Sequence, residues 1–241
     1  MKKTIQRVLA AVILFAMILS GGFSEVGKVH AEKQQGTTKR AIYVVFDNSG
    51  SMYGDGNKAW SQATYAMEVF AAMMNYESGD VMKVFPMHDI TTDGNTGSAT
   101  KSSMEIRGKD DIAQIHNMYT PKPGGTPYTQ VNNAAGELTK LLNAGSVDEG
   151  WLVVLTDGDF DNDIPASGLK ADLEGKAAAN ENLYVQYLAI GTDVKNIPEG
   201  NADKGLYAQK AGNTSEVVNA VAEISNRIFK RNEYAGYSSE D

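Results

Sequence analysis

The stretch Ile42-Tyr43-Val44-Val45-Phe46, followed at once by Asp47-Asn48-Ser49-Gly50-Ser51, decides how this chain folds. An apolar run without alternation is typical of a parallel strand that is buried on both faces. The polar residues that follow have the pattern D-x-S-x-S, which places one carboxylate and two hydroxyls at alternate positions of a tight turn. Gly50 lets the backbone of that turn approach a ligand closely, because glycine has no side chain. The stretch therefore predicts a core strand that ends in a cluster of oxygen atoms.

Strands and helices alternate along most of the chain. Besides residues 40–46, the apolar patterns predict strands at residues 81–85, 104–106, 151–155, 183–190 and 206–209. Periodic apolar positions predict helices at residues 58–75, 110–118, 127–143 and 167–180, and a final helix after residues 213–216. This alternation favours an α/β fold, with a doubly wound, mostly parallel and Rossmann-like sheet flanked by helices on both faces.

Local signals refine the ends and faces of several helices. Thr126 followed by Pro127 is a preferred pairing of N-cap and first helical position, so a helix is expected to begin there. Asn213-Thr214-Ser215-Glu216 resembles a capping box ahead of the final helix. Apolar faces at spacings of three and four are formed by Trp60, Ala63, Met67, Phe70 and Met74 in one helix and by Val217, Val221, Ile224 and Ile228 in the last.

Bulk composition narrows the class of protein. The 241 residues are 42% hydrophobic and 22% charged, which is ordinary for a globular chain. The cysteine count of 0 excludes disulfides and zinc–thiolate sites. The net charge is -8 and no basic patch is evident in the sequence. Nucleic-acid binding is therefore not expected, and binding to an anionic membrane surface is disfavoured.

The amino-terminal segment has the layout of a secretory signal peptide. Basic residues at 2–7 precede the apolar stretch Val8–Leu19, and Val29-His30-Ala31 offers small or modest side chains at a cleavage site. The apolar stretch would rise roughly 18 Å as a helix, short of the ~30 Å hydrocarbon core of a membrane. We expect a secreted or cell-surface protein, with membrane contact only if the segment stays uncleaved. The lack of cysteine is compatible with secretion by a bacterium that makes little use of disulfides, so a bacterial source is expected. The expected organisation is a signal peptide at residues 1–31, a polar linker at 32–39, the domain at 40–231 and a flexible tail at 232–241.

Two later segments carry oxygen atoms that match those of the D-x-S-x-S turn. They are Gly124-Gly125-Thr126-Pro127 and Leu155-Thr156-Asp157-Gly158. In parallel sheets ligands bind beyond the carboxyl ends of the strands, where the strand order reverses, and Asp47 and Asp157 both follow strong strands. Each piece alone predicts only a turn or a cap. Together they offer the hard oxygen ligands that Mg²⁺ prefers, from Asp47, Ser49, Ser51, Thr126 and Asp157.

The three pieces, in this order along the chain, resemble the von Willebrand factor A (vWA) family and its metal-ion-dependent adhesion site (MIDAS). The resemblance covers roughly residues 40–230. It implies that Ser49, Ser51 and Thr126 bind the cation through hydroxyl oxygens, and that Asp47 and Asp157 act directly or through waters. The expected cation is Mg²⁺, with Mn²⁺ or Ca²⁺ as alternatives. The resemblance also implies a binding role in adhesion or surface-complex assembly, in which an extracellular protein partner supplies a carboxylate. Neither catalysis nor a small-molecule substrate is expected.

Two alternative functions stay open at this stage. The domain could be a scaffold whose metal ion is only structural. It could also be a metal-dependent phosphoesterase with Asp47 as the nucleophile. That chemistry usually needs a second acid two positions later, where Ser49 stands, and a lysine placed to hold phosphate, which the sequence does not suggest. The enzyme is therefore the weakest of the three hypotheses.

Residues beside the candidate site carry further expectations. Asp157, Asp159, Asp161 and Asp163 alternate like a calcium loop, but the glycine and glutamate that such a loop needs are replaced by Asn162 and Gly168. The four acids are instead expected to form an acidic rim that limits which partners bind.

Some large side chains next to the candidate site are expected to be exposed contacts around the metal, with partial packing as the alternative. They are Met52, Tyr53 and Tyr128. His88 and His116 are expected to be surface histidines.

Overall fold

The computed structural model describes residues 38–230, except 159, 162–163, 165 and 193. The predicted signal peptide at residues 1–31 and the predicted tail at 232–241 lie outside the described residues. The same holds for most of the linker predicted at 32–39. None of the helices in the described part combines the length and the apolarity needed to cross a bilayer.

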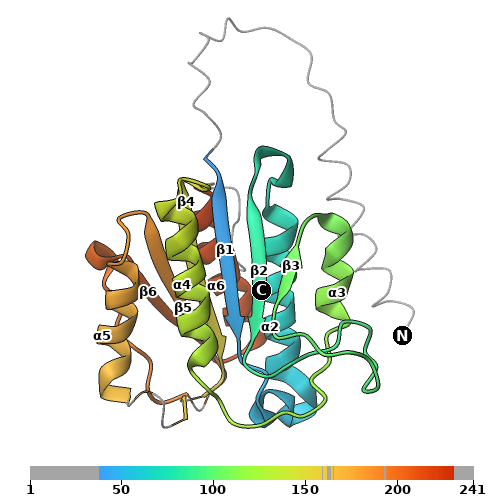
Figure 1. Cartoon of the computed structure of the whole chain (residues 1–241). Coiled ribbons are helices and arrows are strands. Elements are labelled where there is room, and N and C mark those ends of the chain that lie inside the picture. Colours follow the sequence, from blue (N-terminus) through green and yellow to red (C-terminus); the bar gives the residue numbers. More distant parts are fainter. Residues whose placement is uncertain (1–37, 159, 162–163, 165, 193, 231–241) are drawn as a thin grey trace, which may run out of the picture. The chain divides into compact units, whose positions relative to one another are not determined.

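The strands of the described residues form one sheet in the order β3-β2-β1-β4-β5-β6 (Figure 1). All neighbouring pairs are parallel except β2 and β3, which run antiparallel. This confirms the predicted fold class and the short edge strand. The bounds are β1 (Arg40–Phe46), β2 (Val81–Pro86), β3 (Met104–Ile106), β4 (Glu149–Thr156), β5 (Leu183–Ile190) and β6 (Leu206–Ala211).

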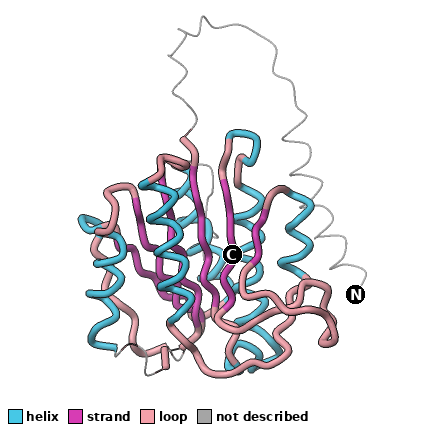
Figure 2. The backbone as a smooth tube through the Cα atoms, viewed as in Figure 1, coloured by secondary structure: helices cyan, strands magenta, loops and turns pink. Residues whose placement is uncertain are grey.

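Helices cover both faces of the sheet (Figures 1 and 2). One face carries α2 (Gly54–Met73), α3 (Ile112–His116) and α6 (Thr214–Phe229), whose buried side chains join one core cluster. The other carries α4 (Thr129–Asn143) and α5 (Ala166–Ala177), which join a second cluster. The domain is therefore a three-layer α/β arrangement with a core on each side of the sheet.

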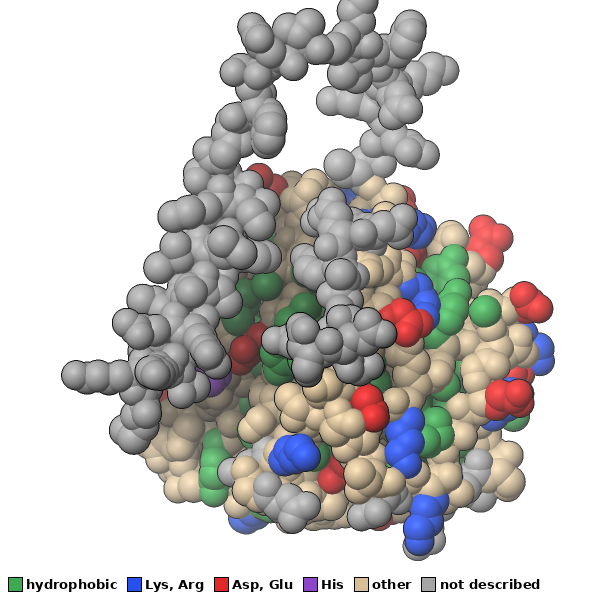
Figure 3. Space-filling view, turned by 180° about the vertical axis from the view of Figure 1, so that it is seen from behind, with side chains coloured by type: hydrophobic (Ala, Val, Ile, Leu, Met, Phe, Trp, Pro, Cys, Tyr) green, Lys and Arg blue, Asp and Glu red, His purple; other side chains and the backbone are tan. Residues whose placement is uncertain are grey.

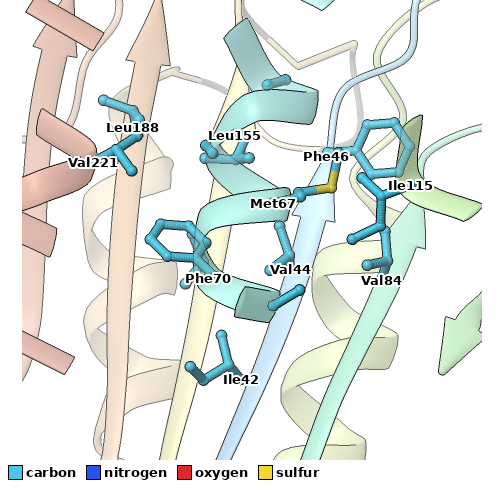
Figure 4. Close-up of a cluster of buried hydrophobic side chains, with 14 of the residues drawn as sticks. Ile42, Val44, Phe46, Met67, Phe70, Val84, Ile115, Leu155, Leu188 and Val221 are labelled. Carbon is cyan, nitrogen blue, oxygen red and sulfur yellow. The ribbon is translucent and has the colours of Figure 1, made fainter. Parts of the chain in front are cut away.

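The unbroken apolar run of β1 follows from this double coverage. Ile42, Val44 and Phe46 point to the cluster beneath α2, whereas Ala41, Tyr43 and Val45 belong to the cluster beneath α4. Figure 4 shows the first set beside Met67 and Phe70 of α2. Burying each large apolar side chain contributes roughly 1.5–3 kcal/mol. Both sets of alternate residues therefore stabilise the fold, and a polar residue in either set would lower the free energy of unfolding. The predicted apolar faces of α2 and α6 also lie in the first cluster.

Two helix starts differ from their predictions. The helix predicted from residue 58 begins at Gly54, because a 3₁₀ turn at Gly50–Tyr53 leads directly into it. The helix predicted to be capped by Thr126 begins only at Thr129, with Tyr128 as its N-cap residue. The backbone N–H and carbonyl of Thr126 are bonded to Asp161 in another loop, so Thr126 does not start a helix.

The predicted capping box of α6 is confirmed. Asn213 Oδ1 accepts a hydrogen bond from the Glu216 amide at 3.0 Å, and Glu216 Oε2 accepts one from the Gly212 amide at 2.6 Å. The first bond satisfies a donor that the first helical turn would otherwise leave without an intrahelical partner. The second joins Glu216 to the residue that precedes the N-cap Asn213.

Figure 3 shows acidic and basic side chains interspersed on the face turned away in Figure 1, and the described side chains in view form no continuous basic patch.

Candidate metal centre

The carboxyl ends of β1 and β4 lie side by side at the point where the strand order reverses. After β1 the chain continues to β2 on one side, and after β4 it continues to β5 on the other. Phe46 is paired with Leu155, and the Asp47 amide donates to the Leu155 carbonyl at 2.8 Å. The turns that follow the two strands therefore begin at the same level, in the crevice where open α/β sheets bind ligands.

Four of the five predicted site residues lie in one chain of hydrogen bonds. Asp47 is fully buried, and its Oδ1 accepts from the Ser49 amide at 2.8 Å. The hydroxyls of Ser49 and Ser51 are 2.9 Å apart. Ser51 Oγ donates to Asp157 Oδ1 at 2.9 Å. From the β4 side, Thr156 Oγ1 donates to Asp47 Oδ2 at 2.8 Å. The structure thus brings the D-x-S-x-S turn and the T-D-G turn together.

The fifth predicted residue, Thr126, is on a loop that contacts the same turn. The Gly50 amide donates to the Gly124 carbonyl at 3.1 Å, which joins the two segments two residues away from Thr126. Thr126 is 7% exposed. The loop that carries the third predicted hydroxyl therefore lies against the serine turn, as the candidate site requires.

The His88 ring contacts the two glycines of that loop, Gly124 and Gly125. Its Nε2 is 2.6 Å from the Gly125 carbonyl, and because a carbonyl only accepts, Nε2 carries the hydrogen in this contact. A Cβ on Gly124 would lie 2.9 Å from His88 Cε1. The predicted surface position holds in part for His88, which is partly exposed and packs on the loop. It is confirmed for His116, which is exposed and 3.2 Å from Glu68.

Asn48 connects the loops that surround the site, and sequence reasoning missed it. Its side chain is fully buried. Asn48 Oδ1 accepts from the His88 amide at 2.8 Å, while Nδ2 donates to the His88 carbonyl at 2.7 Å and to Thr120 Oγ1 at 2.8 Å. The residue occupies an unspecified position of D-x-S-x-S, so the pattern did not point to it. An amide directly after a buried strand was the only available signal.

The structure describes two acids of the predicted rim, Asp157 and Asp161, and gives Asp161 a contact that the prediction did not include. Asp161 Oδ2 accepts from the Thr126 amide at 2.8 Å, so this carboxylate holds a neighbouring loop. Asp159 and Asp163 lie outside the described residues. Sequence spacing could place Asp161 near the site, but it could not show that the acid bonds to the backbone of residue 126.

The aromatic and thioether side chains next to the site are packed, as the alternative prediction held. Met52 is fully buried in the core beneath α2. Tyr53 stacks on Trp60 with ring centroids 4.8 Å apart. Tyr128 is 3% exposed, and its hydroxyl donates to Asp172 at 2.6 Å. The prediction of exposed contacts around a metal is therefore wrong for Met52 and Tyr128.

The electrostatics of the two acids favour a bound cation. Burial raises the pKa of the Asp157 carboxyl, and the neighbouring charge of Asp47 raises it further, while the Ser51 hydroxyl acts in the opposite direction. Among the described residues, neither acid takes part in an ion pair with a lysine, arginine or histidine. A cation between the two carboxylates would remove their repulsion and favour the ionised form of Asp157.

The donor set fits a hard divalent cation. In the part of the chain that the structure describes, no three His, Cys, Asp or Glu side chains gather as a metal site. A metal held here would therefore depend on the serine and threonine hydroxyls as well as the two carboxylates. Oxygen donors of this kind suit Mg²⁺ and Mn²⁺ better than thiophilic metals.

Cation affinity is expected to fall as the pH is lowered. In the cation-free protein the folded-state pKa of Asp157 is raised. The stability that this group contributes is therefore fully present below its unfolded pKa and is lost as pH rises through the folded pKa. A bound cation favours the ionised form of Asp157 instead, so cation binding should release the proton of this carboxyl. Calorimetric titration with Mg²⁺ at about pH 7 and about pH 5, in buffers of different protonation enthalpy, checks this. Equal affinities at both values without proton release would contradict it.

Known proteins share the fold but not a recognisable sequence. No protein-family model matches the chain, and no curated protein matches it. Proximal thread matrix protein 1 from the mussel byssus, in a structure with a zinc-occupied MIDAS motif, aligns with a TM-score of 0.56 at 13% identity, over 80% of this chain and 48% of that one. The pilus adhesin SpaC from Lactobacillus rhamnosus GG aligns with a TM-score of 0.53 at 17% identity, over 82% of this chain and 31% of that one. The chain spans less than half the length of either protein, and at such identities the likeness establishes the fold.

Proposed function

We propose that this chain, whose described domain has a von Willebrand factor A-like fold, binds a divalent cation and, through it, an acidic group of a protein partner. Ser49, Ser51 and Thr126 would hold the ion through their hydroxyl oxygens. Asp47 and Asp157 would contribute carboxylate oxygens, directly or through waters. Mg²⁺ is the first candidate, and Mn²⁺ and Ca²⁺ are alternatives.

The observation that carries the proposal is the hydrogen-bonded group formed by Asp47, the two serines and Asp157. It combines hydroxyl oxygens with two neighbouring carboxylates at the strand-order reversal. Mg²⁺ strongly prefers six oxygen ligands and retains waters where the protein supplies fewer. When bound, the ion supplies Lewis acidity toward an incoming carboxylate. The hydroxyls of the chain are neutral, so where the two carboxylates act through waters, most of the ion's charge stays available to a partner's Asp or Glu.

The known proteins of this fold support the location and the kind of function. One of them is titled a pilus adhesin, and another is a byssus matrix protein with a metal-occupied motif. A secreted or cell-surface protein of this fold, carrying the predicted signal peptide, would act in adhesion or in the assembly of a surface complex. Its partner would be an extracellular protein, and neither nucleic acid nor a small-molecule substrate is proposed.

The geometry of Asp47 weighs against the phosphoesterase alternative. Its side chain is fully buried, and both oxygens accept hydrogen bonds, from the Ser49 amide and from Thr156 Oγ1. A carboxylate nucleophile needs an oxygen that can reach the substrate. Asp47 is better suited to orient the turn and compensate the charge of an ion.

A peptide-capture experiment tests the role of the ion in partner binding. The immobilised, Mn²⁺-loaded chain is presented with random peptides that each contain one Asp or Glu, and with matched peptides carrying Asn or Gln there. We expect retention of acidic peptides only, and release by EDTA. Ser51→Ala, which removes an exposed hydroxyl, should reduce retention, whereas Ser215→Ala on exposed α6 surface should not. Retention that is equal for both peptide sets, or indifferent to EDTA, would favour a purely structural ion.

A further inference from the structure

Asp161 and Thr126 are joined by two reciprocal hydrogen bonds. The Thr126 amide donates to Asp161 Oδ2 at 2.8 Å, and the Asp161 amide donates to the Thr126 carbonyl at 2.9 Å. A pair of this kind fixes both the position and the orientation of the Thr126 backbone. The two residues are on different loops, one leading into α4 and the other following β4.

Gly125 provides the space that the Asp161 carboxylate occupies. A Cβ at this position would clash with Oδ2 of Asp161 and would lie 2.8 Å from Oδ1, so the carboxylate would have to shift. Gly125 does not have a left-handed backbone, so alanine would conflict with the carboxylate and not with the backbone conformation. An added methyl group would therefore displace the carboxylate and break its bond to the Thr126 amide.

A second contact joins the same two loops. Phe160 meets Tyr128 edge-on, with ring centroids 4.7 Å apart and an interplanar angle of 81°. Two successive residues after β4 thus hold two nearby residues before α4. The loop that carries Asp157 and the loop that carries Thr126 therefore form one unit, which meets the serine turn through the Gly50–Gly124 hydrogen bond.

We propose that Asp161 is a positioning residue, which holds Thr126 in place for the cation through these reciprocal bonds and through the space left by Gly125. This inference rests on the proposed function, because it assigns the residue a role in forming that metal centre. The loop that follows β4 would then supply the Asp157 carboxylate to the metal centre and would also hold the Thr126 hydroxyl in position. Groups of this kind, which orient metal ligands without binding the metal, typically alter affinity roughly ten- to hundredfold when they are removed.

The first test compares Asp161→Ala with Asp161→Asn. In the cation-free protein, NMR hydrogen exchange at the Thr126 amide should become roughly tenfold faster in Asp161→Ala, because the amide loses its acceptor. Exchange in β4 and β5 should stay at the parent rates, which separates loop release from global destabilisation. Mn²⁺ affinity measured by calorimetry should fall roughly ten- to hundredfold. Asp161→Asn keeps an acceptor oxygen and should restore slow exchange. Asp203→Ala, at an exposed acid on the 3₁₀ turn Ala202–Lys204, should match the parent.

The second test combines Gly125→Ala with Asp161→Ala. Each single variant should speed exchange at Thr126 and weaken Mn²⁺ binding, because both break the same hydrogen bond. The double variant should be no worse than the weaker-binding single variant, since one interaction cannot be lost twice. Gly136→Ala, at an exposed helical glycine with nothing within 4 Å of an added Cβ, is the matched control and should match the parent.

The outcomes separate this inference from the proposed function. Unchanged Thr126 exchange in Asp161→Ala, or effects in the double variant equal to the sum of the single effects, would overturn the role of Asp161. If the parent chain gives no heat with Mn²⁺, the proposed function fails. Amide exchange in the cation-free variants would then decide alone whether Asp161 holds the loop.

Discussion

Asp47→Ala is expected to abolish cation binding, with a loss of affinity of at least about 100-fold. The substitution removes a carboxylate from the centre and deprives the Ser49 amide of its acceptor, whereas Thr156 Oγ1 can still donate to the Gly158 carbonyl at 3.1 Å. Leaving a buried donor without a partner costs roughly 1–3 kcal/mol, so the cation-free fold should also be less stable. Calorimetric titration with Mg²⁺, Mn²⁺ and Ca²⁺, together with denaturant unfolding, measures both effects. Titration heats identical to those of the parent would refute the metal centre.

Asp47→Asn separates the charge of this residue from its hydrogen bonds. The amide oxygen can still accept from the Ser49 backbone, so the turn should be largely retained. The repulsion that Asp47 exerts on Asp157 disappears, and the pKa of Asp157 should move down toward its ordinary value. Cation affinity should nevertheless fall strongly, because only one of the two carboxylates remains. A variant that binds Mg²⁺ as tightly as the parent would show that the charge of Asp47 plays no part in holding the ion.

Cation binding is expected to stabilise the domain by about 2.7 kcal/mol when the free cation is at about 100 times its dissociation constant. The proposed site combines three loops that meet only in the folded chain, so the ion would bind the native state and not the unfolded one. For domains of 150–250 residues each kcal/mol corresponds to roughly 2–4 °C, so the unfolding midpoint should rise by roughly 5–11 °C. Differential scanning calorimetry with and without Mn²⁺, followed by EDTA, measures the shift and its reversal.

The control for this shift is a sodium chloride solution of the same ionic strength, applied to the parent chain and to Asp47→Asn. Screening by salt acts on all surface charges, whereas a specific ion acts only at its own site. The parent should therefore respond to Mn²⁺ but not to the matched salt, and Asp47→Asn should respond to neither. An equal rise in the parent and the variant would trace the stabilisation to non-specific binding and contradict the prediction.

The strands could be predicted closely because their signals are local. The predictions at residues 40–46, 104–106 and 183–190 match β1, β3 and β5. Strands covered on both faces need apolar side chains at every position, so the run of residues itself marks the element. Helix starts were less accurate, since α2 continues from a 3₁₀ turn and α4 begins three residues after Thr126.

The grouping of Asp47, Ser49, Ser51 and Asp157 was predictable for a related reason. The first three are close neighbours in one turn, and the last follows a second core strand, so parallel pairing of β1 and β4 is enough to bring them together. The alternation of strands and helices along the whole chain predicts a parallel sheet, and a parallel sheet places the two turns at the same edge. Nothing comparable was available for Asn48, His88 and Asp161, whose partners lie on separate loops.

The amino-acid sequence by itself determined the α/β fold, the coverage of the sheet on both faces and the oxygen-rich turns after two core strands, because periodicity and composition act over a few residues. Only the tertiary structure decided that Thr126 belongs to a loop held by Asp161, that His88 packs on the diglycine and that Met52 and Tyr128 are buried. The physical reason is that these contacts join loops that are distant in sequence. The folded sheet determines which of these loops come close enough to form hydrogen bonds.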